Sequence, residues 1–327
     1  MKSEFTAEFL SDLYRQMVTI RFFEESLVAP ILNSEIRTPC HLSCGQEAIA
    51  VGLCSGLSRD DYVFGSHRSH GHYLAKGGDL RAMMAEIYCK ATGCSRGRGG
   101  SMHVIDQDVG MMGSAPIVAG TVSLAVGAAL AAQIRQDGRV VVSFFGDGAC
   151  GEGVLYESLN FAALKRLPVI FACENNLYST HLPIRECRVS QPIYMTAASF
   201  GIESHQVDGN DLLQVLGAGR NAVEACRKGN GPVFLELMTY RLRGHVGPDD
   251  AIQGTHQDIR PQHEIEAWRK RDPITCFERY LLAGQLVDEH TMASIRADVA
   301  AGIGKARDYA MESPSPRREE LLRYVFA

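Results

Sequence analysis

Two strongly apolar runs, separated by enough chain for one helix, place the strongest constraint on how this sequence can fold. Residues 139–145 and 168–173 each lack the alternation of a half-exposed strand. Continuous apolar strands are typical of parallel sheets covered by helices on both faces. A third such run, residues 232–240, follows a helical pattern at 211–228. The alternation predicts an α/β fold with a doubly wound, mainly parallel sheet flanked by helices.

The remainder of the 327-residue chain reads largely as helix. Apolar spacing and turn residues predict helices at 6–28, 45–57, 79–92, 118–135, 153–166, 263–283 and 288–310. Glycine content predicts loops at 93–101 and around Gly244, Gly247, Pro248 and Gly254. We expect one domain over residues 1–327, with its core at about 40–245, an N-terminal helix and a helical C-terminal extension at about 263–327.

Composition excludes several classes of partner. The formal net charge is -5 and the pI about 6.1, which gives no basic footprint for nucleic acid or for an anionic membrane surface. Ten cysteines without a Cys-x-x-Cys pair indicate reduced thiols. The first residues resemble neither a signal peptide nor a transit peptide. We therefore expect a cytoplasmic protein.

The uncharged stretch from residue 116 to 134 is nearly long enough to span a membrane. Its glycine, alanine, threonine and serine content favours a buried core helix instead. Gly127 and Ala131, four residues apart, would let another backbone approach closely. We predict a core helix and no membrane span.

Polar residues stand directly after the first two apolar runs. Gly146-Asp147-Gly148 follows one, and Asn175-Asn176 follows the other. Ligands of such sheets bind beyond the carboxyl ends of the strands. Mg²⁺ takes oxygen ligands and often bridges to phosphate, so Asp147 and Asn176 are candidate metal ligands. The glycines would let phosphates approach, and a following helix would offer free N–H groups. A solvated turn and an ordinary Asn loop are the alternatives, which the pairing of two motifs disfavours.

This paired pattern resembles the thiamine-diphosphate signature. Further blocks, in the same order, resemble the E1α subunits of 2-oxo acid and acetoin dehydrogenase complexes. The blocks are His41-Leu42-Ser43-Cys44-Gly45-Gln46-Glu47-Ala48, Arg68-Ser69-His70-Gly71, Gly99-Gly100-Ser101-Met102-His103, Leu167-Pro168-Val169-Ile170-Phe171, Val207-Asp208-Gly209-Asn210-Asp211 and Gly244-His245. Together they cover most of the chain.

The resemblance implies thiamine diphosphate and Mg²⁺ as cofactors. Its metal shell would be Asp147, Asn176 and the backbone carbonyl of Tyr178. His70 and His245 would be catalytic, near the reactive carbon or the phosphates. The cofactor-binding set would be Arg68, Ile117, Val118, Gly146, Asp147, Gly148, Ala149, Asn176, Tyr178 and His245. For Arg96 and Arg98 we expect only solvated loop charges, and the role of His103 stays open.

The resemblance also implies a divided enzyme. The glutamate that activates the cofactor in this family belongs to a domain that E1α chains lack, so an E1 β subunit would complete an α2β2 heterotetramer. A lipoyl-bearing E2 protein would accept the acyl group from a 2-oxo acid such as pyruvate or from acetoin. Addition of the acyl carbanion to another carbonyl is the alternative outcome. A Rossmann-type nicotinamide dehydrogenase is a third alternative: Gly146, Gly148 and Gly151 have the Gly-x-Gly-x-x-Gly spacing between a predicted strand and a predicted helix, but the second motif, Asn175-Asn176, favours the thiamine-diphosphate family. An inert scaffold partner would need the metal ligands lost.

Three departures from the family pattern bear on the substrate. His67 stands where an aromatic residue is common, and Pro116 where glycine is frequent. Residues 244–250 lack a serine-rich loop and resemble the acetoin-type subgroup, so we expect no control by phosphorylation there. The identity of the small oxo-compound substrate stays open.

Overall fold

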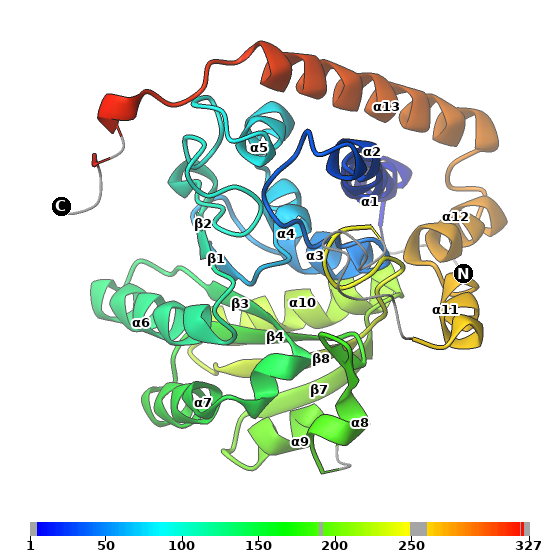
Figure 1. Ribbon diagram of the computed structural model, residues 1–327. Coiled ribbons are helices and arrows are strands. Elements are labelled where there is room, and N and C mark those ends of the chain that lie inside the picture. Colours follow the sequence, from blue (N-terminus) through cyan, green and yellow to red (C-terminus); the bar gives the residue numbers. More distant parts are fainter. Residues whose placement is uncertain (1–4, 190–191, 249–259, 321, 324–327) are drawn as a thin grey trace.

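A parallel sheet forms the centre of the computed structural model, which describes residues 5–189, 192–248, 260–320 and 322–323 (Figure 1). Six strands run in the order β2-β1-β3-β4-β8-β7, all parallel. Their bounds are β1 Tyr62–Gly65, β2 Met111–Ser114, β3 Val141–Gly146, β4 Val169–Asn175, β7 Glu203–Asp208 and β8 Val233–Met238. A two-stranded hairpin, β5 Tyr178–Ser179 and β6 Leu182–Pro183, lies apart from the sheet. The predicted doubly wound fold is confirmed.

Helices cover both faces of the sheet (Figure 1). In β3, Val142 and Phe144 pack into one buried cluster, whereas Val141 and Phe145 pack into the other. The first cluster includes residues of α1 Ala7–Ser26, α3 Glu47–Cys54, α5 Leu80–Ile87, α10 Leu212–Arg227, α12 Pro273–Ala283 and α13 Glu289–Glu312. The second includes residues of α6 Gly120–Arg135, α7 Gly153–Lys165 and α9 Ile193–Ala198. Burial on both faces explains why β3 and β4 read as continuous apolar runs.

The remaining helices are short. They are α2 Val28–Leu32, α4 His70–Ala75, α8 Ile184–Cys187 and α11 Gln262–Arg269, with 3-10 turns η1 Gln107–Val109, η2 Asp147–Gly151 and η3 Arg318–Glu320. The predicted helix at 263–283 is in fact α11 and α12, because Asp272 caps a new helix with Pro273 in its first turn. The predicted helix at 6–28 ends at Ser26, and α2 follows. Gly254 of the predicted loop lies outside the described residues.

Helix α6 corrects one prediction. It is only half buried: Val122 and Ala125 pack inward, whereas Leu124 is 59% exposed. Gly127 is exposed, and a Cβ placed on it would meet nothing within 4 Å. The expectation that Gly127 and Ala131 admit another backbone is therefore wrong within this chain. Among the helices of the described residues, none combines the length and apolar character that a membrane span requires.

Candidate functional site

A pocket of about 680 Å³, counting its open mouth, lies beyond the carboxyl ends of β3 and β4. The two strands pair in parallel, with Gly146 opposite Glu174, so the motifs that follow them meet at one edge. Pocket-lining residues include Gln46, His67, Arg68, Ile117, Val118, Gly146, Asp147, Gly148, Ala149, Asn176, Tyr178, Arg241 and His245. All predicted cofactor residues therefore lie together, and of the predicted site only His70 does not line the pocket.

Asp147 presents an unsatisfied carboxylate. It follows β3 at the start of η2 and is 2% exposed, and its Oδ2 has no hydrogen-bond partner among the described residues. Burial raises its pKa to about 6, against the opposing charges of Arg241 and Arg68. A buried acceptor without a partner is rare and calls for an explanation. A bound cation would both complete the site and restore the ionised form.

Asn176 and its neighbours form a shaped turn opposite Asp147. The Asn176 amide donates to Gln46 Oε1 at 3.4 Å, and its own oxygen accepts from the Tyr178 backbone N–H at 3.3 Å. Leu177, between them, has a left-handed φ of 71°, which costs energy in a non-glycine residue. The turn brings amide and carbonyl oxygens close to the Asp147 loop, and this is the donor set that Mg²⁺ prefers.

Gly148 allows the two sides of this turn to approach. A Cβ at that position would lie 2.5 Å from Ser179 Oγ and 3.1 Å from Ser179 Cβ. A larger residue would require the Ser179 side chain to rotate and its Cβ to shift by a few tenths of an ångström. The second glycine of Gly146-Asp147-Gly148 is thus favoured by packing as well as by access to a ligand.

Two buried arginines give the pocket its charge. Arg68 is 4% exposed, and its guanidinium donates to the carbonyls of Leu42 at 2.5 Å and His245 at 3.1 Å. Arg241 is 1% exposed and donates to the Thr180 carbonyl at 2.8 Å. Of the described residues that line the pocket, these are the only arginines or lysines. Guanidinium groups beside glycine N–H groups favour a multiply charged anion.

Three histidines cluster beside the arginines. The rings of His41, His67 and His245 lie 4.5 to 5.4 Å apart between centroids. Burial, followed by the charge of Arg68, lowers their pKa values, to about 3 for His67 and about 2 for His245. Their ligand atoms lie within 4.8 Å of one another, close enough for a metal. The neighbouring guanidinium charges oppose a cation there, so we interpret the cluster as the neutral wall of an anion site.

His70 lies elsewhere. It is fully buried, its Nδ1 is 2.9 Å from Glu24 Oε2, and its Nε2 is 2.8 Å from Ser101 Oγ. Both ring nitrogens are therefore occupied by protein groups. His70 does not line the pocket, and a catalytic role for it stays a prediction.

The glycine-rich loop at 93–101 also has a structural explanation. It wraps around the fully buried carboxylate of Glu86, which accepts the backbone N–H groups of Ser95, Gly97, Gly99 and Gly100 at 2.8 to 3.0 Å. Arg98 donates to the Glu320 carbonyl, and the His103 ring lies 3.3 Å from the Gly99 carbonyl. None of these side chains lines the pocket. Arg96 and Arg98 are both exposed on this loop.

Comparisons with known proteins bear on this geometry. Residues 15–319 match the model of the dehydrogenase E1 component family. The chain belongs to this family. It is 40% identical over 315 residues to subunit alpha of acetoin:2,6-dichlorophenolindophenol oxidoreductase from Bacillus subtilis, covering 96% of this chain and 92% of that one. Pyruvate dehydrogenase E1 component subunit alpha is 36% identical in Porphyra purpurea (96% and 92% covered) and 38% in Rhizobium meliloti (98% and 90%).

The E1 family membership confirms the resemblance stated from the six sequence blocks and, with it, the class of activity: an oxidoreductase E1 component of the α-subunit type. The structure adds site residues that the motif reading missed, namely Gln46, His67 and Arg241 on the pocket wall and His41 beside it. Gln46 and His41 stand in a quoted block, so a signal was present. Arg241 stands three residues before Gly244-His245, where its burial could not be inferred from sequence.

Proposed function

We propose that this E1α-type chain holds thiamine diphosphate through Mg²⁺ at the carboxyl edge of β3 and β4. The observation that carries the proposal is the buried, unpartnered Oδ2 of Asp147, facing the Asn176–Tyr178 turn across the pocket. Asp147, the Asn176 side-chain oxygen and the Tyr178 carbonyl would hold the metal. A single carboxylate with two neutral oxygens leaves room for phosphate oxygens, as Mg²⁺ sites usually do.

Different pocket residues would bind different parts of the cofactor. Arg68 and Arg241 would bind the diphosphate oxygens, with His245 as a neutral neighbour and the N–H groups of Gly148 and Ala149 at the start of η2. Ile117 and Val118, at the mouth of the pocket, would meet the aminopyrimidine. The cofactor supplies a nucleophilic carbon and an electron sink for cleavage of a bond next to a carbonyl. The chain's own contribution is to orient it and to neutralise its charge.

Acetoin is the substrate that the pocket favours. A 2-oxo acid would bring a carboxylate, and the only arginines or lysines among the described lining residues are the two already assigned to the diphosphate. His67 adds a neutral polar ring to the pocket wall because its pKa lies near 3. Acetoin is uncharged and needs no further cation. The 40% identity to an acetoin oxidoreductase subunit supports the same substrate.

A β subunit is the proposed partner, as the subunit names of the relatives suggest. An apolar surface continues from the pocket mouth along α6: Ile117 is 74% exposed, Leu124 59% and Ile134 74%. Exposed apolar patches of this kind mark protein interfaces. We propose that the β subunit covers this face and so closes the pocket in an α2β2 assembly. A lipoyl-bearing E2 protein would then accept the acyl group. The unpaired cysteines favour the cytoplasm.

Calorimetric titration of thiamine diphosphate with Mg²⁺ into the chain co-expressed with its β subunit tests the proposal. Binding that requires Mg²⁺, followed by cleavage of acetoin in preference to pyruvate or branched oxo acids, is the expected result. Leu124→Asp should abolish co-purification of the β subunit, whereas Leu282→Asp, on the exposed side of α12, should not. Absence of cofactor binding in a folded αβ assembly would refute the assignment.

A further inference from the structure

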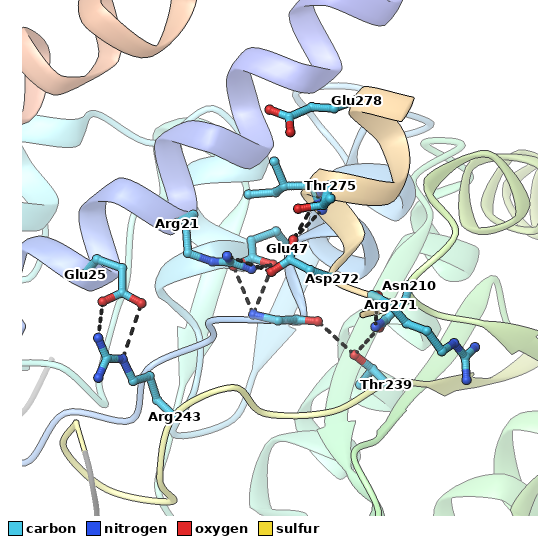
Figure 2. A network of polar contacts seen from close by, with 12 residues as sticks. Arg21, Glu25, Glu47, Asn210, Thr239, Arg243, Arg271, Asp272, Thr275 and Glu278 are labelled. Carbon is cyan, nitrogen blue, oxygen red and sulfur yellow. Dashed lines mark hydrogen bonds and ion pairs between the residues drawn. The ribbon is translucent and has the colours of Figure 1, made fainter. Parts of the chain in front are cut away.

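Three charged side chains near the C-terminal end of α1 reach segments that build the pocket. Arg21 binds Glu47, Glu24 binds Ser43 and His70, and Glu25 binds Arg243. Figure 2 shows Arg21 and Glu25 extending from α1 toward these segments. Helix α1 lies outside the sheet, yet its polar residues converge on the loops that carry Gln46, Arg68 and His245.

The Arg21 contact joins α1 to a fully buried carboxylate, that of Glu47. Its Nε and Nη2 donate to the two carboxylate oxygens of Glu47 at 2.5 and 3.0 Å, and its Nη1 donates to Asp272 Oδ2 at 2.9 Å. Glu47 is fully buried, and both of its oxygens also accept the Gly45 N–H, at 3.0 and 3.1 Å. The Glu47 carboxylate thus joins the Arg21 side chain of α1 to the backbone N–H of Gly45 and fixes residues 45–47. A bidentate pair of this kind fixes orientation as well as distance.

Gln46 lies between the hydrogen-bonded residues Gly45 and Glu47, and it lines the pocket. Its Oε1 accepts from the Asn176 amide group, which turns the Asn176 oxygen the other way, toward the Tyr178 N–H. The path from α1 to the proposed metal ligand therefore has three links: Arg21 to Glu47, Glu47 to the backbone around Gln46, and Gln46 to Asn176. Outer-shell groups of this type set the orientation of metal ligands.

The carbonyl group and the Cα of Gly45 are also held in place. The Thr239 hydroxyl lies 3.2 Å from the Gly45 carbonyl and 2.8 Å from Asn210 Oδ1, and the Asn210 amide donates to the Arg271 carbonyl (Figure 2). Gly45 has a φ of 97°, and a Cβ there would lie 2.5 Å from the Tyr240 carbonyl oxygen. This network also explains the Val207-Asp208-Gly209-Asn210-Asp211 block, which joins the sheet to the start of α12 and does not line the proposed cofactor pocket.

We propose that α1 is a positioning element of the cofactor site and that Arg21, through Glu47, sets the orientation of Gln46 and hence of Asn176. The inference rests on the proposed function, because Asn176 matters as a metal ligand only if the pocket holds Mg²⁺ and a diphosphate. Arg21 and Glu47 are positioning residues, since neither lines the pocket.

Glu47→Gln, Asp272→Asn and Glu278→Gln, each assembled with the β subunit, test the proposal. Glu47→Gln keeps the side-chain size but places an NH₂ group against the Arg21 donors. Asp272→Asn keeps the cap of α12, since asparagine caps helices as well as aspartate, and replaces the charged oxygen that accepts from Arg21 with an NH₂ group. Glu278→Gln is the matched control, because Glu278 also joins α1 to the C-terminal helices, through Tyr14 and Arg296, but has no link to the pocket.

The measurements are the melting temperature and the half-saturating concentration of Mg²⁺ at fixed thiamine diphosphate, by calorimetry and by initial rate. All three variants are expected to melt earlier. The half-saturating Mg²⁺ concentration should rise about tenfold in Glu47→Gln and about threefold in Asp272→Asn, both with kcat retained at saturation, and should not rise in Glu278→Gln. If Glu47→Gln does not fold, the Asp272→Asn comparison decides.

Equal Mg²⁺ dependence in Asp272→Asn, Glu278→Gln and the unaltered enzyme would overturn the proposal, as would equal dependence in a folded Glu47→Gln. Failure of the underlying function looks different. In that case the unaltered assembly itself shows no Mg²⁺-dependent binding of thiamine diphosphate, and no variant comparison arises.

Discussion

The pocket differs from the polar seam beneath α1, which is formed by Arg21 and Glu24 with Ser43, Glu47 and His70. Both contain buried polar side chains, but they differ in how far these are hydrogen-bonded. In the pocket, Asp147 Oδ2 and His41 Nδ1 are buried without hydrogen-bond partners among the described residues. Along the seam, the carboxylates of Glu24 and Glu47 are fully buried, and each accepts several hydrogen bonds from protein groups. An unsatisfied buried polar group costs about 1–3 kcal/mol. At the pocket, the unsatisfied carboxylate oxygen of Asp147 marks where a ligand can complete the structure, whereas the satisfied carboxylates of the seam hold it together.

Among the tests of this comparison, Asp147→Ala should have the largest effect. If the unpartnered carboxylate is the metal ligand, its loss should weaken Mg²⁺-dependent binding of thiamine diphosphate at least 100-fold, on the order of 3 kcal/mol. The melting temperature of the ligand-free chain should not fall, because no internal hydrogen bond of Oδ2 is lost. Calorimetry with and without Mg²⁺ gives the first quantity, and a thermal scan the second. Retained Mg²⁺-dependent binding would mean that the metal lies elsewhere.

Arg241→Met should have the next largest effect. Removal of one of the two guanidinium groups from the pocket is expected to weaken thiamine diphosphate binding about tenfold to 100-fold, as loss of a charge-assisted hydrogen bond does. Thiamine monophosphate, which carries less charge, should lose less. The ratio of the two dissociation constants is the measurement, and Arg296→Met, away from the pocket, is the control. An unchanged ratio would contradict a diphosphate role for Arg241.

The same contrast explains what sequence reasoning could and could not reach. The apolar runs predicted β3, β4 and β8 because burial on two faces leaves a plain signal. Strands β1 and β2 have only four residues each, and β7 is a mostly polar strand at the edge of the sheet. None of these three strands leaves an apolar run in the sequence. Asp147 and Asn176 could be placed because they directly follow strands. His70 could not, because a motif does not say whether the fold will satisfy both of its ring nitrogens.

A comparison of His70→Gln with His245→Gln sharpens this point. His70 is paired with buried Glu24, whose pKa is held below its ordinary value because the charge and hydrogen bond of His70 outweigh the opposing effect of burial. His70→Gln should therefore cost stability, about 3–5 kcal/mol for a broken buried pair, with kcat at saturation changed less than about threefold. His245→Gln should lower activity and leave the melting temperature nearly unchanged. The reverse outcome would support a catalytic role for His70.

The smallest expected effect is the pH dependence of cofactor binding. Burial raises the Asp147 pKa from 3.8 to about 6, and Mg²⁺ needs the ionised form, so a proton competes with the metal. Affinity should be about halved at pH 6 and fall about tenfold for each further pH unit below. His67 and His245, with pKa values near 3 and 2, stay neutral over this range and add no slope. Titrations between pH 5 and 8 measure it.

The stability of the ligand-free chain should change with pH in the direction opposite to that of cofactor binding. A carboxyl whose pKa is raised by folding binds its proton more tightly in the folded chain, so its contribution is fully present below pH 3.8 and is lost as the pH rises through about 6. Asp147→Asn has no such proton. Relative to that variant, the unaltered chain should therefore melt progressively earlier from pH 5 to 7, and Mg²⁺ with thiamine diphosphate should reverse the trend. A pH-independent difference would place the Asp147 carboxylate in contact with water or a partner, and the contrast between pocket and seam would no longer hold at its central residue.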